Sequence, residues 1–368
     1  MQISSIEGER PAPVGLPGAE RVVRDSAPTL PIAPVSAVEP IGATVPELRA
    51  LPGAAAPQPV GAPPHIDRRR RALLTVLSST YLFAFAGIAI WGASWPAVVG
   101  FVLLSYLGMI LHELVLHRFL AHKAFRTSRW FRFVLTLGAM MWPARGPIWW
   151  AATHRHHHRH ADTEEDVHSP RHGRLHATVG WLFAPRALAM GDAEVHDLTR
   201  DPEMRALQRV FKLPFLCSIG LGFLAGRAVE ALWPASGMTA MQGLVWWGLL
   251  RALYPVLMMG VVNNFGHRAP YGRRRFATGD DTRNLDALAW LTAGASLHNN
   301  HHHYPHGARA GFFPGEPDPT YWTIRLLQKL GLVWSVRDVP AAKLEEDRVD
   351  LGAADHRAEA VAPVADAA

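Results

Sequence analysis

The sequence has a single cysteine, Cys217, among its 368 residues. One cysteine excludes a disulfide framework, and it excludes zinc or iron–sulfur sites that need several thiolates. The sequence also has no glycine-rich fingerprint for a flavin or nicotinamide dinucleotide, and no HPGG-like element of a fused haem domain. Redox chemistry in this chain would therefore need another kind of metal centre and an external source of electrons.

Acidic residues are in deficit, with 31 Asp and Glu against 37 Lys and Arg, which gives a net charge of +6. Such a balance suits nucleic acid or an anionic membrane surface. The mean hydropathy of +0.04 hides a segregated pattern, because long apolar runs alternate with very polar ones. The apolar runs favour the membrane, and no nucleic acid partner is predicted.

The first 66 residues lack a hydrophobic pattern and are rich in Pro, Ala, Gly and Val, as in LPGAAAPQPVGAPP. This composition has few aromatic residues to bury, which predicts a disordered arm, with a targeting role as the alternative. The first apolar run begins far from Met1, so no cleavable signal peptide is expected. Residues 341–368 are likewise predicted to form a disordered tail.

Four apolar runs divide the rest of the chain, and a helix needs about 20 such residues to cross roughly 30 Å of hydrocarbon. The expected spans are residues 72–91, 97–112, 213–233 and 243–262. Short turns separate the first run from the second and the third from the fourth. The sequence therefore predicts an all-α integral membrane domain over residues 67–340, with four transmembrane helices in two hairpins.

Several charged residues interrupt these runs. Arg227 and Glu230 are three residues apart and are expected to pair. Arg251 is unusual within a span, and an intramembrane charge is a functional candidate. Snorkelling, or pairing with Glu230, explains Arg251 equally well. Residues 130–150 are apolar but contain arginines and prolines, which favours an interfacial or re-entrant segment over additional spans.

The distribution of Lys and Arg predicts the topology. The segments before the first span, after the second and after the fourth are basic, whereas the loops GASWP and PASGMTAMQ have no Lys or Arg. By the positive-inside rule, both termini and every histidine cluster face the cytoplasm.

The sequence has 20 histidines, most of them in a few clusters. His117 and His122 are five residues apart where the second span is expected to leave the membrane. Two triplets have the offsets i, i+3, i+4, and the fourth span ends with Asn263 and His267 at i, i+4. The triplets are His154, His157 and His158, and His298, His301 and His302. On a helix these offsets share one face, so each triplet can present its imidazoles to one point.

Neutral imidazole is a ligand for iron, copper, zinc and nickel. Eight to nine nitrogen donors and one amide oxygen are too many for one ion, so two metal ions with open coordination positions are predicted. The cysteine-free set favours non-haem iron and oxygen chemistry over structural zinc. A single cluster could instead be a solvated basic patch, and the spacing from Glu113 to His117 does not match the HExxH motif of zinc proteases. His156 and His303 are predicted to be bystanders or to support the ligands.

The clusters resemble the histidine boxes of the membrane fatty acid desaturases, and most of all those of bacterial acyl-CoA Δ9 desaturases related to stearoyl-CoA desaturase. The HxxxxH box corresponds to residues 117–122, the two HxxHH boxes to 154–158 and 298–302, and the NxxxH element to 263–267. The intervening text HHRHADTEEDVHSPRHG is also similar. The resemblance covers roughly residues 70–340.

This resemblance implies a centre of two iron ions under a cytosolic helical cap, with O₂ as co-substrate. It implies ten ligands: His117, His122, His154, His157, His158, His267, His298, His301 and His302, with Asn263 acting through water. The implied reaction inserts a cis double bond, at carbon 9, into a saturated fatty acyl chain held as a thioester or in a lipid. An oxidising metal must attack the unactivated methylene, so the protein binds and orients the metal and the chain.

Other residues are candidates for binding the substrate. The possible walls of an acyl tunnel are Trp142, Trp149, Trp150 and Trp181, for which interfacial anchoring is the alternative. The possible contacts to a phosphate-bearing head group are Arg145, Arg186 and Arg274, which positive-inside topology explains equally well. The expected electron donor is a separate ferredoxin, rubredoxin-like protein or cytochrome b5, and an acidic carrier would suit the basic cytoplasmic face.

Two other functions remain open at the level of sequence. A hydroxylase on the same scaffold would begin with the same hydrogen abstraction and would give an alcohol in place of an alkene. A non-enzymatic metal-binding or transport protein is less consistent with the sequence, because the spans contain few polar residues and the metal donors lie outside them.

Overall fold

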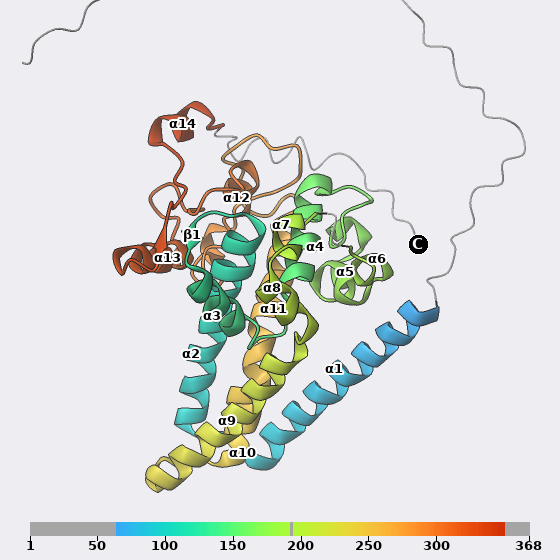
Figure 1. The fold of residues 1–368 in the computed structure, drawn as a ribbon, viewed down its shortest axis with the longest axis vertical. Coiled ribbons are helices and arrows are strands. Elements are labelled where there is room, and N and C mark those ends of the chain that lie inside the picture. The colour runs from blue at the N-terminus through green and yellow to red at the C-terminus, as the bar shows by residue number, and fades with distance from the viewer. Residues whose placement is uncertain (1–63, 192–193, 350–368) are drawn as a thin grey trace, which may run out of the picture. The chain divides into compact units, whose positions relative to one another are not determined.

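The computed structural model describes residues 64–191 and 194–349, which are mostly helical (Figure 1). Four helices in this part of the chain are long and apolar enough to cross a membrane: Leu74–Trp91, Trp95–Ala121, Lys212–Leu232 and Ala240–Phe265. The predicted helical class and the four candidate spans are therefore confirmed. The predicted arm, residues 1–66, lies almost entirely outside the described residues.

The second and fourth candidate spans are longer than the apolar runs that predicted them, whereas the first and third are not. The first belongs to α1 (Pro64–Trp91), and the third is α9 (Lys212–Leu232). The second joins α2 (Trp95–Leu111) to the π-helix η1 (His112–Ala121), so the helix continues through the first histidine of the HxxxxH box. The fourth contains α10 (Ala240–Gln242), η5 (Gly243–Leu249), η6 (Leu250–Ala252) and α11 (Leu253–Phe265). Packing, which hydropathy does not report, extends the second and fourth helices into polar sequence.

Glycines allow α9 and η5 to approach closely. A Cβ atom on Gly222 would lie 2.6 Å from the backbone nitrogen of Gly248, and one on Gly226 would lie 2.8 Å from Cα of Gly243. No other residue fits at such a distance, and small residues are the usual means of close packing between membrane helices. The short η4 (Pro234–Ser236) lies in the connection that follows α9.

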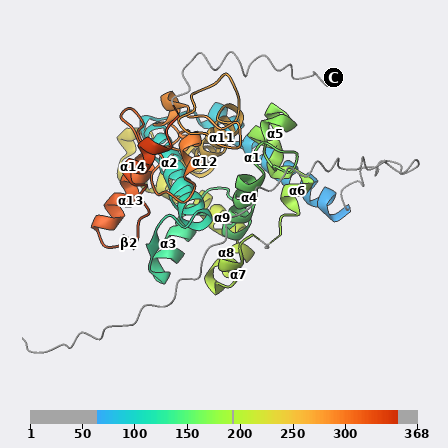
Figure 2. The same ribbon diagram turned by 90° about the horizontal axis from the view of Figure 1, so that it is seen from above.

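The elements with the histidines lie at one end of α2 and α11 (Figures 1 and 2). The longer helices there are α3 (Arg129–Ala139), α4 (Pro147–His160), α8 (Pro202–Arg209) and α13 (Pro319–Lys329). The shorter ones are η2 (Pro170–His172), α5 (Arg174–Thr178), η3 (Gly180–Phe183), α6 (Pro185–Leu188), α7 (His196–Thr199), η7 (Asp286–Leu288), α12 (His298–His303) and α14 (Ala341–Glu346). Strand β1 (Arg126–Thr127) pairs antiparallel with β2 (Val333–Trp334). Residues 130–150 form α3, a turn and the start of α4, and none of the four candidate spans includes them.

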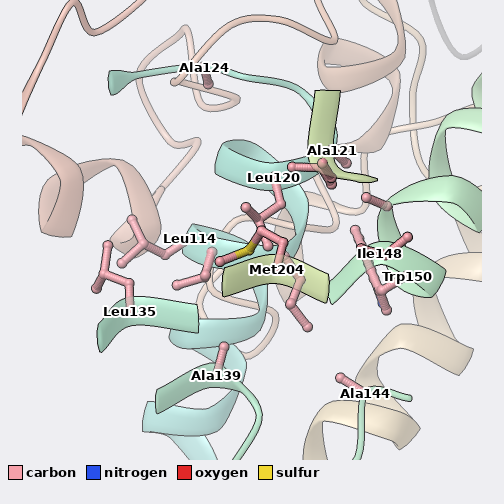
Figure 3. Packing of buried hydrophobic residues seen from close by; sticks show 14 of the residues in the cluster. Leu114, Leu120, Ala121, Ala124, Leu135, Ala139, Ala144, Ile148, Trp150 and Met204 are labelled. Carbon is pink, nitrogen blue, oxygen red and sulfur yellow. The ribbon is translucent and has the colours of Figure 1, made fainter. Parts of the chain in front are cut away.

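The largest hydrophobic cluster fixes η1 against α3, α4 and α8 (Figure 3). Met204 of α8 is fully buried in it, beside Leu114, Leu135 and Ile148. Asp201 caps α8, because its Oδ1 accepts hydrogen bonds from the backbone N–H groups of Glu203 and Met204. This core holds the histidine-bearing helices η1 and α4 in fixed register.

The charged residues in the spans have clear partners. Arg227 and Glu230 form the expected ion pair at 3.5 Å. Arg251 is 3 % exposed, and its guanidinium lies over the ring of Trp142 and donates to the carbonyls of Met141 and Trp247. Both sequence-based alternatives for Arg251, snorkelling and pairing with Glu230, are therefore wrong. The residue joins the fourth span to the turn before α4.

The folded part of the chain continues past the predicted boundary at residue 341. Residues 341–346 form α14, and Leu344 is buried against Phe276 and Phe312. The backbone N–H of Val349 donates to the carbonyl of Arg275 at 2.8 Å. The predicted disorder of residues 341–349 is therefore wrong, because the burial of Leu344 depends on residues distant in the sequence. Residues 350–368 lie outside the described part.

Candidate metal centre

Four segments bring the predicted histidines together. His117 belongs to η1 and His122 follows it; α4 provides a triplet, α12 provides the other triplet, and His267 lies just beyond α11. They form a five-histidine group of His117, His122, His154, His158 and His301, and a four-histidine group of His157, His267, His298 and His302. Within each group, the possible ligand atoms all lie within 4.8 Å of one another.

The spacing predicted that each triplet converges on one point, and this prediction is wrong. His154 and His158 belong to the five-histidine group, whereas His157, from the same triplet, belongs to the four-histidine group. In α12, His298 and His302 join the four-histidine group and His301 joins the other. Residues at i and i+4 point in nearly the same direction, whereas i+3 lies on the other flank of the face, so each helix serves both groups.

In the five-histidine group, the inner ring nitrogens approach each other closely. Nε2 of His117 lies 2.9 Å from Nε2 of His301, and Nε2 of His122 lies 2.8 Å from that of His154. His158 Nε2 is 3.0 Å from both His154 Nε2 and His301 Nε2. Two imidazole nitrogens, each about 2.1 Å from one ion and at right angles, would be about 3 Å apart.

The four-histidine group shows why these nitrogens suit a cation. His157 Nδ1 donates to Asp166 at 3.0 Å, and His302 Nδ1 donates to Asp280 at 2.7 Å. In the neutral form both Nε2 atoms are therefore lone-pair acceptors, yet they face each other at 3.3 Å. A metal ion between the two nitrogens would remove this repulsion. The arrangement of the side chains therefore suits the metal ion that the histidine pattern predicts. In the same group, His267 and His298 Nε2 atoms are 2.8 Å apart.

Carboxylates lie behind four of the histidines, and the sequence-based prediction had missed all of them. Besides Asp166 and Asp280, Asp162 accepts from His267 Nδ1 at 3.0 Å, and Glu113 accepts from His117 Nδ1 at 2.6 Å. Such partners fix the ring orientation and tautomer of a metal-binding histidine. The position of Glu113, one turn before His117, was the only local signal, because the aspartates lie in loops.

Burial and neighbouring charges set the protonation of the site. Burial, followed by repulsion from other imidazoles, lowers the pKa of six histidines well below the usual value: His122, His154, His158, His298, His301 and His302. These side chains are therefore neutral, which is the form that binds a metal. Burial also opposes charge on His267 and Asp162, but their mutual attraction outweighs it, raising the pKa of His267 and lowering that of Asp162.

An apolar cavity adjoins both histidine groups. Its walls include His117, His154, His157, His298, Asn263, Met109, Met259, Trp150 and Trp181. A second cavity shares Trp150, Trp181 and Met259 with the first and adds Trp142, Trp149, Pro255 and Val256. The two cavities are therefore neighbours, one beside the histidines and the other beside Pro255 and Val256 of α11.

The other predicted site residues can also be placed. Asn263 donates its amide N–H to the carbonyl of Ala177 at 3.1 Å, which leaves its side-chain oxygen available as an acceptor. Trp142, Trp149 and Trp150 line the cavities. Arg145 lines neither of them, because its guanidinium lies over the Trp149 ring and donates to the carbonyl of Leu182.

Histidines outside the two groups mostly bind backbone carbonyls. His156 donates to Glu165 O, His172 to Asp166 O and His176 to Val167 O, and these bonds fix the loop after α4. His306 donates to the carbonyl of His122 at 2.9 Å. His168 and His112 differ from these. His168 lines the first cavity and forms a possible ligand group with His157 and Asp166, and His112 lines the second cavity.

Comparisons with known proteins agree with this geometry. The family model described as fatty acid desaturase matches residues 93–309, which include all the histidines of both groups. The chain is 34% identical over 268 residues, 70% of its length, to the sn-2 palmitoyl-lipid 9-desaturase of Nostoc sp. (strain 36), of which it covers 87%. It is 33% identical over 247 residues, 66% of its length, to the sn-1 stearoyl-lipid 9-desaturase of Anabaena variabilis, of which it covers 85%. It is also 31% identical over 265 residues, 68% of its length, to the hex-5-enoyl-(acyl-carrier protein) acetylenase of Moorena producens (strain JHB), of which it covers 78%.

Proposed function

Because this chain belongs to the fatty acid desaturase family and is an oxidoreductase acting on acyl chains, we propose that it inserts a cis double bond at carbon 9 of a saturated acyl chain, using O₂ and two iron ions. The observation that carries the proposal is the convergence of nine buried or half-buried histidines on two adjacent points beside an apolar cavity.

The two histidine groups are the proposed ligand sets of the two ions. One ion would be held by His117, His122, His154, His158 and His301, and the other by His157, His267, His298 and His302, with Asn263 acting through water. Iron bound in this way supplies the oxidising power that breaks an unactivated C–H bond, which no side chain can do. The role of the protein is to keep the imidazoles neutral and correctly oriented.

The cavities are the proposed site of the acyl chain. The shared residues Trp150, Trp181 and Met259 offer an apolar surface that would hold the chain beside His117 and His157. Fixing the chain there determines which methylenes face the metal centre. Trp142 and Trp149 line the second cavity and are proposed as walls farther from the histidines. The contact of Arg145 with Trp149 supports a structural role for this arginine better than a contact with the substrate head group.

The position of the double bond is proposed from the names of two relatives, which are 9-desaturases of palmitoyl and stearoyl lipids. The carrier of the chain is proposed to be a thioester or a lipid, because the relatives include acyl-lipid, acyl-CoA and acyl-carrier-protein enzymes. The four spans would form two hairpins under a cytosolic cap, with both termini and the metal centre in the cytoplasm. The basic residues near the ends of the spans support that orientation.

The electron balance requires a partner. Reduction of O₂ to two water molecules takes four electrons, and conversion of a single C–C bond to a double bond provides two of them. The remaining two electrons would come from a ferredoxin, a rubredoxin-like protein or a cytochrome b5. A basic cytoplasmic face would attract an acidic carrier.

The test is a fatty acid profile with mapped double bonds, in a bacterial host that lacks a desaturase. The chain and its His298→Ala variant are expressed at matched levels. A new 9-unsaturated acid in the host with the native chain, absent with the variant, is the expected result. A hydroxy acid would favour the hydroxylase alternative. No new product, with iron in the purified protein and a reducing partner supplied, would contradict the proposal.

A further inference from the structure

The end of the described chain contacts the end of α12, the helix that contains the second HxxHH box, at His303 and Tyr304. We propose that residues 341–349, here called the C-terminal clasp, hold α12 and the loop facing it in place, and so determine how firmly the centre retains its metal. The clasp lies beyond residues 93–309, which the family model matches. The inference rests on the proposed function only in taking iron as the metal.

Asp347 is the polar contact of the clasp. Its Oδ2 accepts a hydrogen bond from the hydroxyl of Tyr304 at 2.5 Å and lies 3.3 Å from Nε2 of His303. Its Oδ1 accepts from Nζ of Lys343 at 3.0 Å, which ties the carboxylate to α14. His303 follows the ligand candidate His302 directly, so Asp347 holds the end of α12.

Apolar contacts support this carboxylate. Leu344 packs on Phe276 and Phe312, and Phe276 stacks on the His303 ring with centroids 4.8 Å apart. Beyond α14, Val349 N–H donates to the carbonyl of Arg275. The clasp therefore contacts both α12 and the loop that contains Arg275 and Phe276.

That loop is joined to the metal centre by two routes. Asn299, next to His298, accepts hydrogen bonds on Oδ1 from the backbone N–H groups of Arg275 and Phe276 at 2.7 and 2.9 Å. Four residues after Phe276, Asp280 accepts the Nδ1–H of His302 at 2.7 Å. The clasp thus supports both the imidazoles of α12 and the carboxylate that orients one of them.

The short length of α12 explains why it needs such support. It has six residues, and isolated helices shorter than about 12 residues are marginal in water. Its position must therefore come from tertiary contacts. His303 is not one of the proposed ligands. Its Nδ1 lies 3.1 Å from the carbonyl of Ala277 and its Nε2 lies 3.3 Å from Asp347 Oδ2, so as an imidazolium it donates to both and joins the loop to the clasp.

The experiment measures metal release from the purified full-length protein in detergent after addition of a chelator. Of two point variants, Asp347→Asn removes the charge of the carboxylate and Tyr304→Phe removes one hydrogen bond to it. A deletion of residues 341–368 removes the clasp. Matched controls are a deletion of residues 350–368 and Glu346→Gln, because Glu346 is an exposed neighbour in the same helix. Thermal unfolding of the apoproteins is recorded in parallel.

We expect iron release to be about 10 to 100 times faster in the clasp deletion, the range for loss of groups that orient ligands, and several times faster in the point variants. The controls should release iron like the native chain, and Asp347→Glu should recover part of the loss. Unchanged release in Asp347→Asn and Tyr304→Phe would overturn the proposal. So would faster release that is matched by an equal loss of stability in the apoproteins, since that would show only a structural role.

Loading with Co²⁺ separates this inference from the proposed function. If the native chain holds cobalt but no iron, the proposed iron centre fails, and the clasp is judged on cobalt release. If the native chain holds neither metal, both proposals fail. If the deletion alone does not fold, the two point variants decide the result.

Discussion

The two histidine groups are held from behind in different ways. In the four-histidine group, three imidazoles donate to carboxylates: His157 to Asp166, His267 to Asp162 and His302 to Asp280. In the five-histidine group, only His117 has such a partner, Glu113, among the hydrogen bonds of the described residues. The rings of the five-histidine group rest mainly on each other and on Trp150, which stacks on His154.

The five-histidine group therefore has more ligands, whereas the four-histidine group has more ligands that a carboxylate supports. A carboxylate behind an imidazole makes it a stronger and better oriented donor. The four-histidine group has fewer ligands, and carboxylates support three of the four. The cavity adjoins both groups, because His117 and His154 line it as well as His298 and Asn263. We therefore expect two inequivalent ions, with the open coordination position at the four-histidine group.

The largest expected effect comes from removing one ligand from each group. His301→Ala and His302→Ala alter adjacent residues of α12 that belong to different groups. Each should reduce the rate of desaturation by more than about 100-fold, which exceeds the effect expected for a residue that only orients a ligand. The ion in the other group should remain bound. Iron per chain and product yield measure this. Equal loss of both ions in the two variants would show that the groups are not separate sites.

The next effect concerns the carboxylates. Asp280→Asn and Glu113→Gln keep the shape of the partner and remove its charge, one in each group. Each should weaken the binding of one ion by about 10 to 100-fold, because the imidazole loses its charged partner. Competition with a chelator, followed by iron spectroscopy, would show two different affected ions. The same spectral change in both variants would contradict the division proposed here.

The folding stability of the apoprotein should depend on pH, mainly through the five-histidine group. Six histidines have pKa values well below 6.5, four of them in the five-histidine group, so the unfolded chain binds more protons than the folded one. Stability should fall as the pH decreases below about 6.5, by up to about 1.4 kcal/mol per pH unit for each such histidine.

The contribution of His267 to stability changes with pH in the opposite direction. Its raised pKa contributes stability that is present below about 6.5 and is lost as the pH rises through the folded value. Asp162→Asn removes the attraction that raises this pKa, so the variant should lose more stability on acidification than the native apoprotein. Thermal unfolding between pH 8 and 5 measures both effects. A melting temperature that does not depend on pH would refute the assignment of neutral histidines.

The smallest effect on metal affinity is expected at a residue that contacts a carboxylate and not a histidine. The hydroxyl of Thr278 donates to Asp280 at 2.7 Å and so holds the carboxylate behind His302. Thr278→Val should cost about 1 kcal/mol, or about fivefold in metal affinity, in the four-histidine group alone. Thr153→Val is the matched control, since that hydroxyl donates to the carbonyl of Trp149 in α4. A loss as large as that of Asp280→Asn would mean that the hydroxyl itself orients the site.

The sequence by itself determined the class of the molecule and which histidines the fold brings together. Apolar runs of the length of a membrane and histidines at helical spacing are local properties, so they could be read without a structure. The carboxylates could not be found in this way. Asp162, Asp166 and Asp280 lie in loops, and their distance from a histidine depends on how distant segments fold together.

Only the tertiary structure decided which histidine belongs to which group. His157 and His158 are adjacent in the sequence, as are His301 and His302, yet each pair is divided between the two groups. Successive residues of a helix point about 100° apart, so one helix can serve two points if those points lie on its two flanks. The spacing permits that arrangement as well as convergence on one point, and the packing of η1, α4, α11 and α12 around a common interior selects it.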